Sequence, residues 1–154
     1  MLYRAATQED IDLLVFMRMI FLEIEENNPE YEMIKENCYT YFRDAFAKDA
    51  CDVILAEEKG KCIGTGIVFY YDSVPSAFNV TGKNAYITSM YVEPEYRGNG
   101  VGTDIVKEII KLVKKRNYTV IMLNASDMGK PMYVKLGFQE IHNGMLLHIG
   151  GSVQ

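Results

Sequence analysis

The sequence lacks a surplus of basic residues and a long apolar run. Lys and Arg number 16 against 21 Asp and Glu, which gives a formal charge of −5 over 154 residues. A general nucleic-acid binder would carry a basic surface, so this balance argues against one. The apolar run at residues 13–17 is far too short for a membrane span. Residues 1–4 show no signal-peptide pattern, so we expect a cytoplasmic protein with no membrane partner.

The sequence also lacks the residue spacings of metal centres and nucleophilic triads. The three cysteines, Cys38, Cys51 and Cys62, form no CxxC pair and are odd in number. They are interpreted as reduced, structural thiols. The only histidines, His142 and His148, flank an Asn-Gly turn and have no triad partner. We therefore predict no metal site.

Hydrophobic periodicity predicts a mixed α/β (α+β) fold. The length corresponds to a single domain, residues 1–154. Period-two and helical patterns predict the order β-α-α-β-β-β-α-β-α-β-β, with Asn143-Gly144 as a hairpin turn. This gives a mostly antiparallel sheet of about seven strands, about four helices, and one parallel crossover from the fourth strand to the fifth. The predicted helices cover residues 11–22, 34–46, 105–117 and 128–136, and the predicted strands cover residues 2–5, 52–57, 62–71, 84–92, 119–123, 138–142 and 145–149.

The most informative segment joins the fourth strand to the third helix. Residues 91–103 read Tyr-Val-Glu-Pro-Glu-Tyr-Arg-Gly-Asn-Gly-Val-Gly-Thr. A helix N-terminus offers unpaired N–H groups, and glycines let a ligand approach the backbone, so the pattern predicts a phosphate or pyrophosphate cradle. A P-loop is excluded because Gly102-Thr103-Asp104 lacks the Gly-Lys-Ser/Thr ending. A tight turn without a ligand is the alternative.

Two motifs resemble those of the GNAT superfamily, the acetyl-CoA-dependent N-acetyltransferases. Arg97-x-x-Gly100-x-Gly102 is similar to the family's Arg/Gln-x-x-Gly-x-Gly/Ala signature. Residues 131–138, Pro-Met-Tyr-Val-Lys-Leu-Gly-Phe, are similar to its Leu-Tyr-x-Lys-x-Gly-Phe segment. The motifs stand in the family's order and separation, and the predicted elements match its fold over nearly the whole chain.

The resemblance implies acetyl-CoA (coenzyme A) as the cofactor and a sheet splayed between the fourth and fifth strands. The fourth strand would pair with the pantetheine arm and the glycine segment would hold the pyrophosphate. Residues near the short fourth helix could add contacts, including one to the 3′-phosphate. The implied cofactor-binding residues are Met90, Tyr91, Val92, Arg97, Gly98, Asn99, Gly100, Val101, Gly102, Thr103, Asn124, Ser126 and Lys130.

The resemblance also suggests catalytic roles and two departures from the pattern. Tyr133 matches the tyrosine that many members place near the thioester sulfur to protonate the departing thiolate. The family's Asn-x-x-Ala is replaced at residues 126–129 by Ser-Asp-Met-Gly. Thr88 stands where some histone-acetylating members carry a glutamate base, so a strand carboxylate is missing there.

Because a strand carboxylate is missing at Thr88, the sequence favours acceptor amines whose pKa is low. A lysine side chain is neutral roughly once in 10³ molecules at pH 7, and an α-amine roughly once in ten. Glu23, Glu25 and Glu26, at the end of the first helix, are candidates for binding or deprotonating a cationic amine, and a solvated helix end is the alternative. We name Glu23, Glu25, Tyr31 and Thr88 as candidate substrate-binding residues.

The sequence thus predicts an N-acetyltransferase in which the acceptor amine attacks the thioester directly. The expected partner is a small amine, amino acid or peptide terminus, and the resemblance allows a homodimer. A protein or aminoglycoside acetyltransferase and a non-catalytic CoA-binding sensor module are the alternatives.

Overall fold

The computed structural model describes residues 1–142 and 144–149. The chain divides into two compact units, Met1–Asn124 and Ala125–Gln154. Each unit is described by itself, and the expected single domain stays a prediction. No helix among the described residues is both long and apolar enough to cross a membrane.

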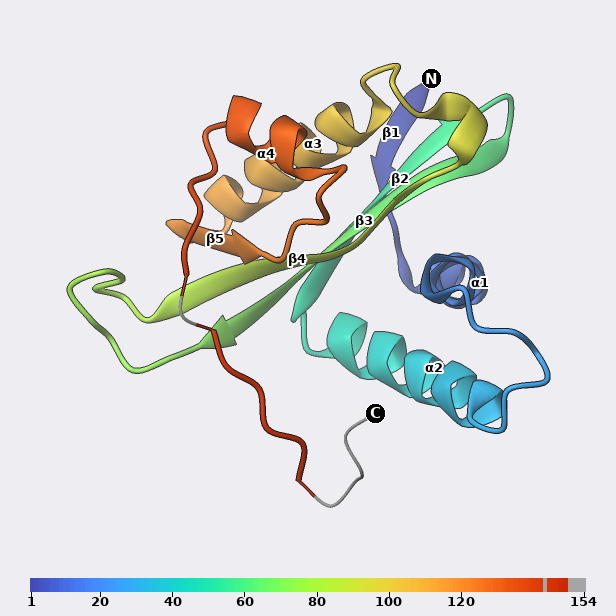
Figure 1. Cartoon of the computed structure of the whole chain (residues 1–154), viewed down its shortest axis with the longest axis horizontal. Coiled ribbons are helices and arrows are strands. Elements are labelled where there is room, and N and C mark those ends of the chain that lie inside the picture. The colour runs from blue at the N-terminus through green and yellow to red at the C-terminus, as the bar shows by residue number, and fades with distance from the viewer. Residues whose placement is uncertain (143, 150–154) are drawn as a thin grey trace. The chain divides into compact units, whose positions relative to one another are not determined.

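The first unit is built on one five-stranded sheet of order β1-β2-β3-β4-β5. Every neighbouring pair is antiparallel except β4 and β5, which are parallel. This confirms the predicted crossover, which runs through α3 (Figure 1). The elements in chain order are β1 Leu2–Ala5, α1 Ile11–Leu22, α2 Tyr31–Ala47, β2 Cys51–Glu58, β3 Lys61–Asp72, β4 Lys83–Val92, α3 Val101–Lys115 and β5 Val120–Leu123.

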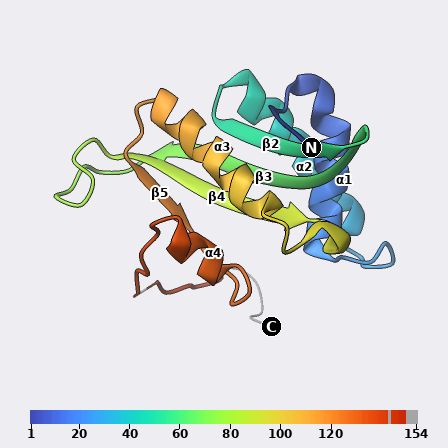
Figure 2. The same ribbon diagram turned by 90° about the horizontal axis from the view of Figure 1, so that it is seen from above.

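Helices cover both faces of the first unit's sheet. The ribbon views place α1 and α2 on one face and α3 on the other (Figures 1 and 2). Leu14, Phe42 and Leu55 belong to the core on the α1–α2 face. On the opposite face α3 packs closely over β3, since a Cβ atom built on Gly66 would lie 2.6 Å from Ile105 Cγ2. The glycine lets the helix approach the strand.

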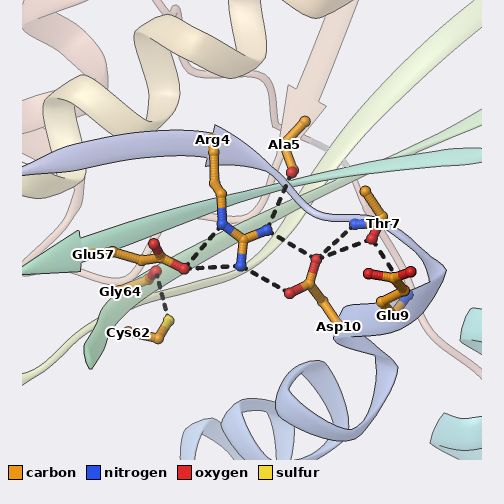
Figure 3. Close-up of polar contacts among 8 residues, drawn as sticks. All are labelled: Arg4, Ala5, Thr7, Glu9, Asp10, Glu57, Cys62 and Gly64. Atoms are coloured by element: carbon orange, nitrogen blue, oxygen red, sulfur yellow. Dashed lines mark hydrogen bonds and ion pairs between the residues drawn. The ribbon is translucent and has the colours of Figure 1, made fainter. Parts of the chain in front are cut away.

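A cluster of charges fixes the entry into α1. The Arg4 guanidinium on β1 donates to Asp10 Oδ1 and Oδ2 at 2.8 and 2.9 Å and to Glu57 Oε1 on β2 at 3.0 Å (Figure 3). Thr7 and Asp10 form a reciprocal capping box at a short 3₁₀ turn, Gln8–Asp10, ahead of α1. The Arg4 contacts lower the pKa of Asp10 to about 2. The ionised carboxylate therefore stabilises the junction of β1, β2 and α1.

The prediction of about seven strands is wrong in its number. The described part of the chain forms five strands, and its residues in segments 138–142 and 145–149 are irregular. Residues 145–149 read Met-Leu-Leu-His-Ile, a nearly continuous apolar run rather than an alternation. Met145 and Ile149 are 99% and 92% exposed, so no burial offsets the entropy of ordering a strand. Of the predicted turn, Asn143 lies outside the described residues.

Candidate active site

A bulge reshapes β4 where the strand approaches the glycine segment. The β3–β4 register shifts between Thr65 and Ile67, whose partners on β4 are Tyr91 and Thr88. Opposite the shift, Ser89 adopts a left-handed conformation with φ 51°, and its side chain is buried. Such a conformation costs a non-glycine residue about 1–2 kcal/mol and persists only where the surroundings impose it. Strain of this kind concentrates at functional sites.

Beyond the bulge, β4 presents an unpaired edge. The last pair of the β4–β5 ladder is Ile87 with Leu123, so no described strand pairs with that edge of residues 88–92. The Glu93 N–H donates to the Ile63 carbonyl of β3 at 2.9 Å. Because N–H groups alternate between the two edges of an antiparallel strand, the Val92 N–H faces away from β3. The splay implied between the fourth and fifth strands is present, with a backbone donor on its β4 side.

The N-terminus of α3 leaves backbone N–H groups and open space at the predicted cradle. Gly98 and Gly100 have φ 77° and 85°, and a Cβ on either would meet nothing within 4 Å, so the loop is open at both positions. Gly100 is the N-cap and no side chain caps the helix. The first main-chain bond runs from the Asp104 N–H to the Gly100 carbonyl. The N–H groups of residues 101–103 consequently lack intrahelical acceptors and carry the positive end of the helix dipole.

Arg97 links the glycine segment to the end of β4, and Asn99 braces the segment internally. Arg97 Nε donates to the Val92 carbonyl at 2.8 Å, and its guanidinium lies 5.9 Å from the centre of the Tyr91 ring. Asn99 Nδ2 donates to the carbonyls of Tyr96 and Arg97 at 3.4 and 3.3 Å. The two terminal nitrogens of Arg97 make no hydrogen bond among the described residues, so they are available to an anion. These residues fit a CoA pyrophosphate, because orphan amides, an exposed guanidinium and an open loop converge there.

A pocket of about 420 Å³ lies in the first unit and includes the bulge in its wall. Its walls come from α1, α2, β3 and β4, and most of its side chains are apolar or aromatic. This volume falls in the range typical of small-molecule sites. The lining residues are Arg18, Leu22, Ile34, Asn37, Cys38, Tyr41, Phe42, Ile67, Phe69, Thr88 and Ser89.

Arg18 is the only lining residue that is charged at neutral pH. Its Nη1 donates to Ser89 Oγ, and its guanidinium lies 5.2 Å from the centre of the Phe21 ring. Within the part of the chain that the structure describes, Arg18 makes no ion pair with a carboxylate. Burial raises the pKa of the Cys38 thiol, which the nearby Arg18 lowers by less, so Cys38 is a neutral wall residue.

The candidate substrate-binding residues fall in different places. Thr88 lines the pocket. Glu23, Glu25 and Tyr31 are not among the lining residues: Glu23 caps the end of α1 with φ 53°, Glu25 is exposed in the α1–α2 connection, and Tyr31 begins α2. Among the described residues, none that lines the pocket is a carboxylate.

Sequence reasoning missed Arg18 and Ser89. Arg18 is the single charge within the last ten residues of α1, which read Leu-Leu-Val-Phe-Met-Arg-Met-Ile-Phe-Leu. That isolated charge was an available signal. Ser89 offered none, because the bulge that strains it depends on the pairing of β3 with β4.

The second unit contains the predicted acid. Tyr133 lies on α4, Lys130–Lys135, is 7% exposed, and packs edge-on against Phe138 with ring centres 5.5 Å apart. Burial raises the pKa of its phenol. Ser126 Oγ accepts the Gly129 N–H at 3.2 Å ahead of α4, and Lys130 pairs with Glu140 at 2.5 Å. Asn124, the last residue of the first unit, is exposed directly after β5.

The fold and these features define an acyl-CoA-type transferase domain. The family model for the acetyltransferase (GNAT) family matches residues 17–138. The chain belongs to this family, whose members use acetyl-CoA.

Related proteins and structures agree with the family. The chain is 32% identical over 88 residues to thialysine N-epsilon-acetyltransferase of Bos taurus, a match that covers 55% of this chain and 49% of the relative. The chain thus spans about half the length of the curated relatives it matches first. A crystal structure of an acetyltransferase from Clostridium acetobutylicum with acetyl-CoA superposes with a TM-score of 0.85 at 35% identity, over 96% of this chain and 95% of the other. A GCN5-related N-acetyltransferase from Ralstonia eutropha shares the fold, with a TM-score of 0.84 at 20% identity over 97% and 99% of the two chains.

Proposed function

We propose that this protein transfers the acetyl group of acetyl-CoA to the amine of a small molecule. One observation carries the proposal. Thr88 and Ser89 both line the pocket and begin the unpaired edge of β4, so a small acceptor in the pocket would lie beside the strand that leads to the cradle. The relative from Bos taurus, by its name, also acetylates a small amine.

The chain's own residues would supply binding and one electrostatic contribution. Acetyl-CoA, when bound, supplies an acetyl group activated as a thioester. The amides of residues 101–103 and Arg97 would hold its pyrophosphate. The Val92 N–H, free of a strand partner, is suited to stabilise negative charge that develops on a carbonyl oxygen during acyl transfer. One such donor is typically worth about 2.7–4 kcal/mol.

The pocket favours the neutral form of an amine, although its described lining residues include no strong base. An ammonium group entering it would leave water for an apolar wall. Desolvation lowers the pKa of an amine. The absence of carboxylates from the wall is therefore compatible with direct attack by an amine that sheds its proton on entry.

Tyr133 remains our candidate for the general acid, on the strength of its motif. A tyrosine phenol is protonated at neutral pH, as a proton donor requires, and burial raises its pKa further. A positioned acid contributes typically about 10²–10⁴-fold to the rate. We expect Tyr133→Phe to lower kcat by at least about tenfold while leaving acetyl-CoA affinity nearly unchanged. Unchanged kcat would remove Tyr133 from this role.

Two alternatives are disfavoured by the pocket. An aminoglycoside is polycationic, and the pocket offers it a guanidinium and no carboxylate in its wall. A folded protein substrate does not require a cavity of small-molecule size. The sensor alternative and the homodimer remain predictions for experiment.

The proposal is tested by thiol release from acetyl-CoA across a panel of small amines. Calorimetry of acetyl-CoA binding is run in parallel. Amine-dependent release of CoA supports the transferase. Tight acetyl-CoA binding with no release for any amine would favour the sensor module instead.

A further inference from the structure

We propose that Arg18 is a specificity-determining residue that binds a carboxylate of the acceptor, so that the substrate is an amine bearing a carboxylate and an apolar stem. This inference rests on the proposed function and names the substrate class of the same pocket. Its basis is the single guanidinium in the apolar wall formed by α1, α2 and the sheet.

The charge of Arg18 lacks a counter-ion. Two other guanidinium groups in the first unit have carboxylate partners, since Arg4 pairs with Asp10 and Glu57 and Arg116 pairs with Asp49 and Asp52. Arg43 and Arg97 make no ion pair among the described residues either, but both are exposed, whereas Arg18 lies partly buried in the pocket wall. Arg18 has no such partner among the described residues, and it shares its pocket with aromatic and aliphatic side chains. A half-buried charge without a partner is costly, and a bound anion would relieve that cost.

The residues around Arg18 hold it in place. Ser89 Oγ accepts from Nη1, and the Phe21 ring packs near the guanidinium. The backbone of Ser89 is strained at φ 51°, so the hydroxyl that orients the guanidinium is itself set by the β4 bulge. A guanidinium carries five N–H donors in a planar fork; Nη1 is used by Ser89, and Arg18 also hydrogen-bonds the Cys38 thiol, which acts to lower the pKa of that thiol. The remaining donors match a carboxylate.

The single cation and the apolar wall of the pocket fit a substrate with one negative charge and an apolar stem. A phosphate ester carries close to two charges at neutral pH and is usually held by several cations or amides, whereas this wall offers one cation. The aromatic side chains Tyr41, Phe42 and Phe69 suit an apolar stem. Ser89 and Val92 are three residues apart, roughly 10 Å along a strand, which leaves room for a stem between the carboxylate and the reacting amine.

The test compares substrates that differ only in charge at one end. 6-Aminohexanoate and its neutral carboxamide, 6-aminohexanamide, carry the same amine at the far end of an unbranched chain, and 6-aminohexyl phosphate tests the other anion. Steady-state kcat/KM is measured for all three. Binding of hexanoate and hexanamide, which have no amine, is measured by calorimetry without acetyl-CoA.

Three variants separate the role of Arg18 from general effects. Arg18→Gln removes the charge and keeps a donor for Ser89. Arg18→Lys keeps the charge and loses the fork, and it serves if Arg18→Gln folds poorly. Arg43→Gln is the matched control, since Arg43 is exposed on α2, is not a pocket residue and stacks on Tyr39 with 5.3 Å to the ring centre.

We expect the wild type to prefer 6-aminohexanoate over the carboxamide by about 10–100-fold, the range of one charge-assisted hydrogen bond or pair of bonds. Arg18→Gln should bring that ratio near one and abolish hexanoate binding, Arg18→Lys should give an intermediate ratio, and Arg43→Gln should change neither. Equal use of acid and amide by the wild type, or hexanoate binding that survives Arg18→Gln, would overturn the proposal. A preference for the phosphate would overturn its choice of anion. If hexanoate binds through Arg18 and no amine is acetylated, the proposed function fails while the anion site stands.

Discussion

The close contact between β3 and α3 gives a test of how the cradle is positioned. A Cβ atom at Gly66 would lie 2.6 Å from both Ile105 Cγ2 and Met90 Sδ, and 3.0 Å from Ile109 Cδ1. Contacts between carbon atoms are comfortable at about 3.5–4.0 Å. Gly66→Ala therefore forces α3 away from the sheet or pushes Met90 on β4 into another rotamer.

The magnitude follows from two opposing effects. Overpacking a core costs about 1–3 kcal/mol. Replacing glycine also stabilises by about 0.4–1 kcal/mol through the unfolded chain. The net expectation is a loss of about 1–2 kcal/mol, which for a chain of this length lowers Tm by about 2–8 °C. Because α3 carries the cradle at its N-terminus, acetyl-CoA should also bind more weakly.

The assay is thermal unfolding followed by circular dichroism, with and without saturating acetyl-CoA. Gly144→Ala is the matched control, since a Cβ at Gly144 meets nothing within 4 Å. It should leave Tm unchanged within about 1 °C. A Gly66→Ala variant as stable as the wild type would refute the packing argument. A destabilised variant with unchanged acetyl-CoA affinity would refute the link between α3 packing and the cradle.

Two further predictions concern the cradle and the N-terminal charge cluster. Gly100→Val places a β-branched residue at φ 85° beside the orphan amides, so we expect acetyl-CoA affinity to fall by more than about tenfold in calorimetry; retained affinity would contradict the cradle. The pKa of Asp10 is depressed to about 2 in the folded chain, so its stabilisation is present above the unfolded pKa, about 3.9, and is lost as pH falls towards 2. Because Arg4 is partly exposed, we expect Asp10→Asn to lower the free energy of unfolding by only about 1–2 kcal/mol at pH 7. The variant should also lose less stability than the wild type between pH 5 and pH 3, as measured by urea unfolding. An equally steep loss in the variant would exclude Asp10 as the source of this pH dependence.

Local patterns were sufficient for most of the fold. The helix predicted from the apolar spacing of residues 11–22 has the same first and last residues as α1. The strands predicted at residues 52–57 and 62–71 correspond to β2 and β3, each of which is one residue longer at both ends. The third helix begins at Val101 rather than Ile105, because glycines at positions 98 and 100 supply the turn and the helix starts as soon as they end. The two C-terminal strands failed because an apolar run without a pairing partner is only a propensity.

The glycine segment shows how far a sequence can determine a site. Arg97, Gly98 and Gly100 lie within four consecutive residues of one loop. The shape of that loop depends on backbone torsions that glycine alone adopts freely. The positive φ angles, the uncapped start of α3 and the Arg97 contact to Val92 all follow from neighbours in the chain. Local chemistry was enough here because no distant residue is needed to make the turn.

The pocket beside the β4 bulge was decided only by tertiary structure. Arg18 and Ser89 are 71 residues apart and meet because α1 packs against the sheet face that carries the β4 bulge. The sequence by itself indicated the family and the order of the elements as far as α4, and it predicted an anion cradle at the glycine segment, since these depend on periodicity and on local torsions. The depth of the pocket, its lone cation and the lack of carboxylates in its wall depend on which faces of α1, α2 and β4 are buried together, and only the packed chain determines that.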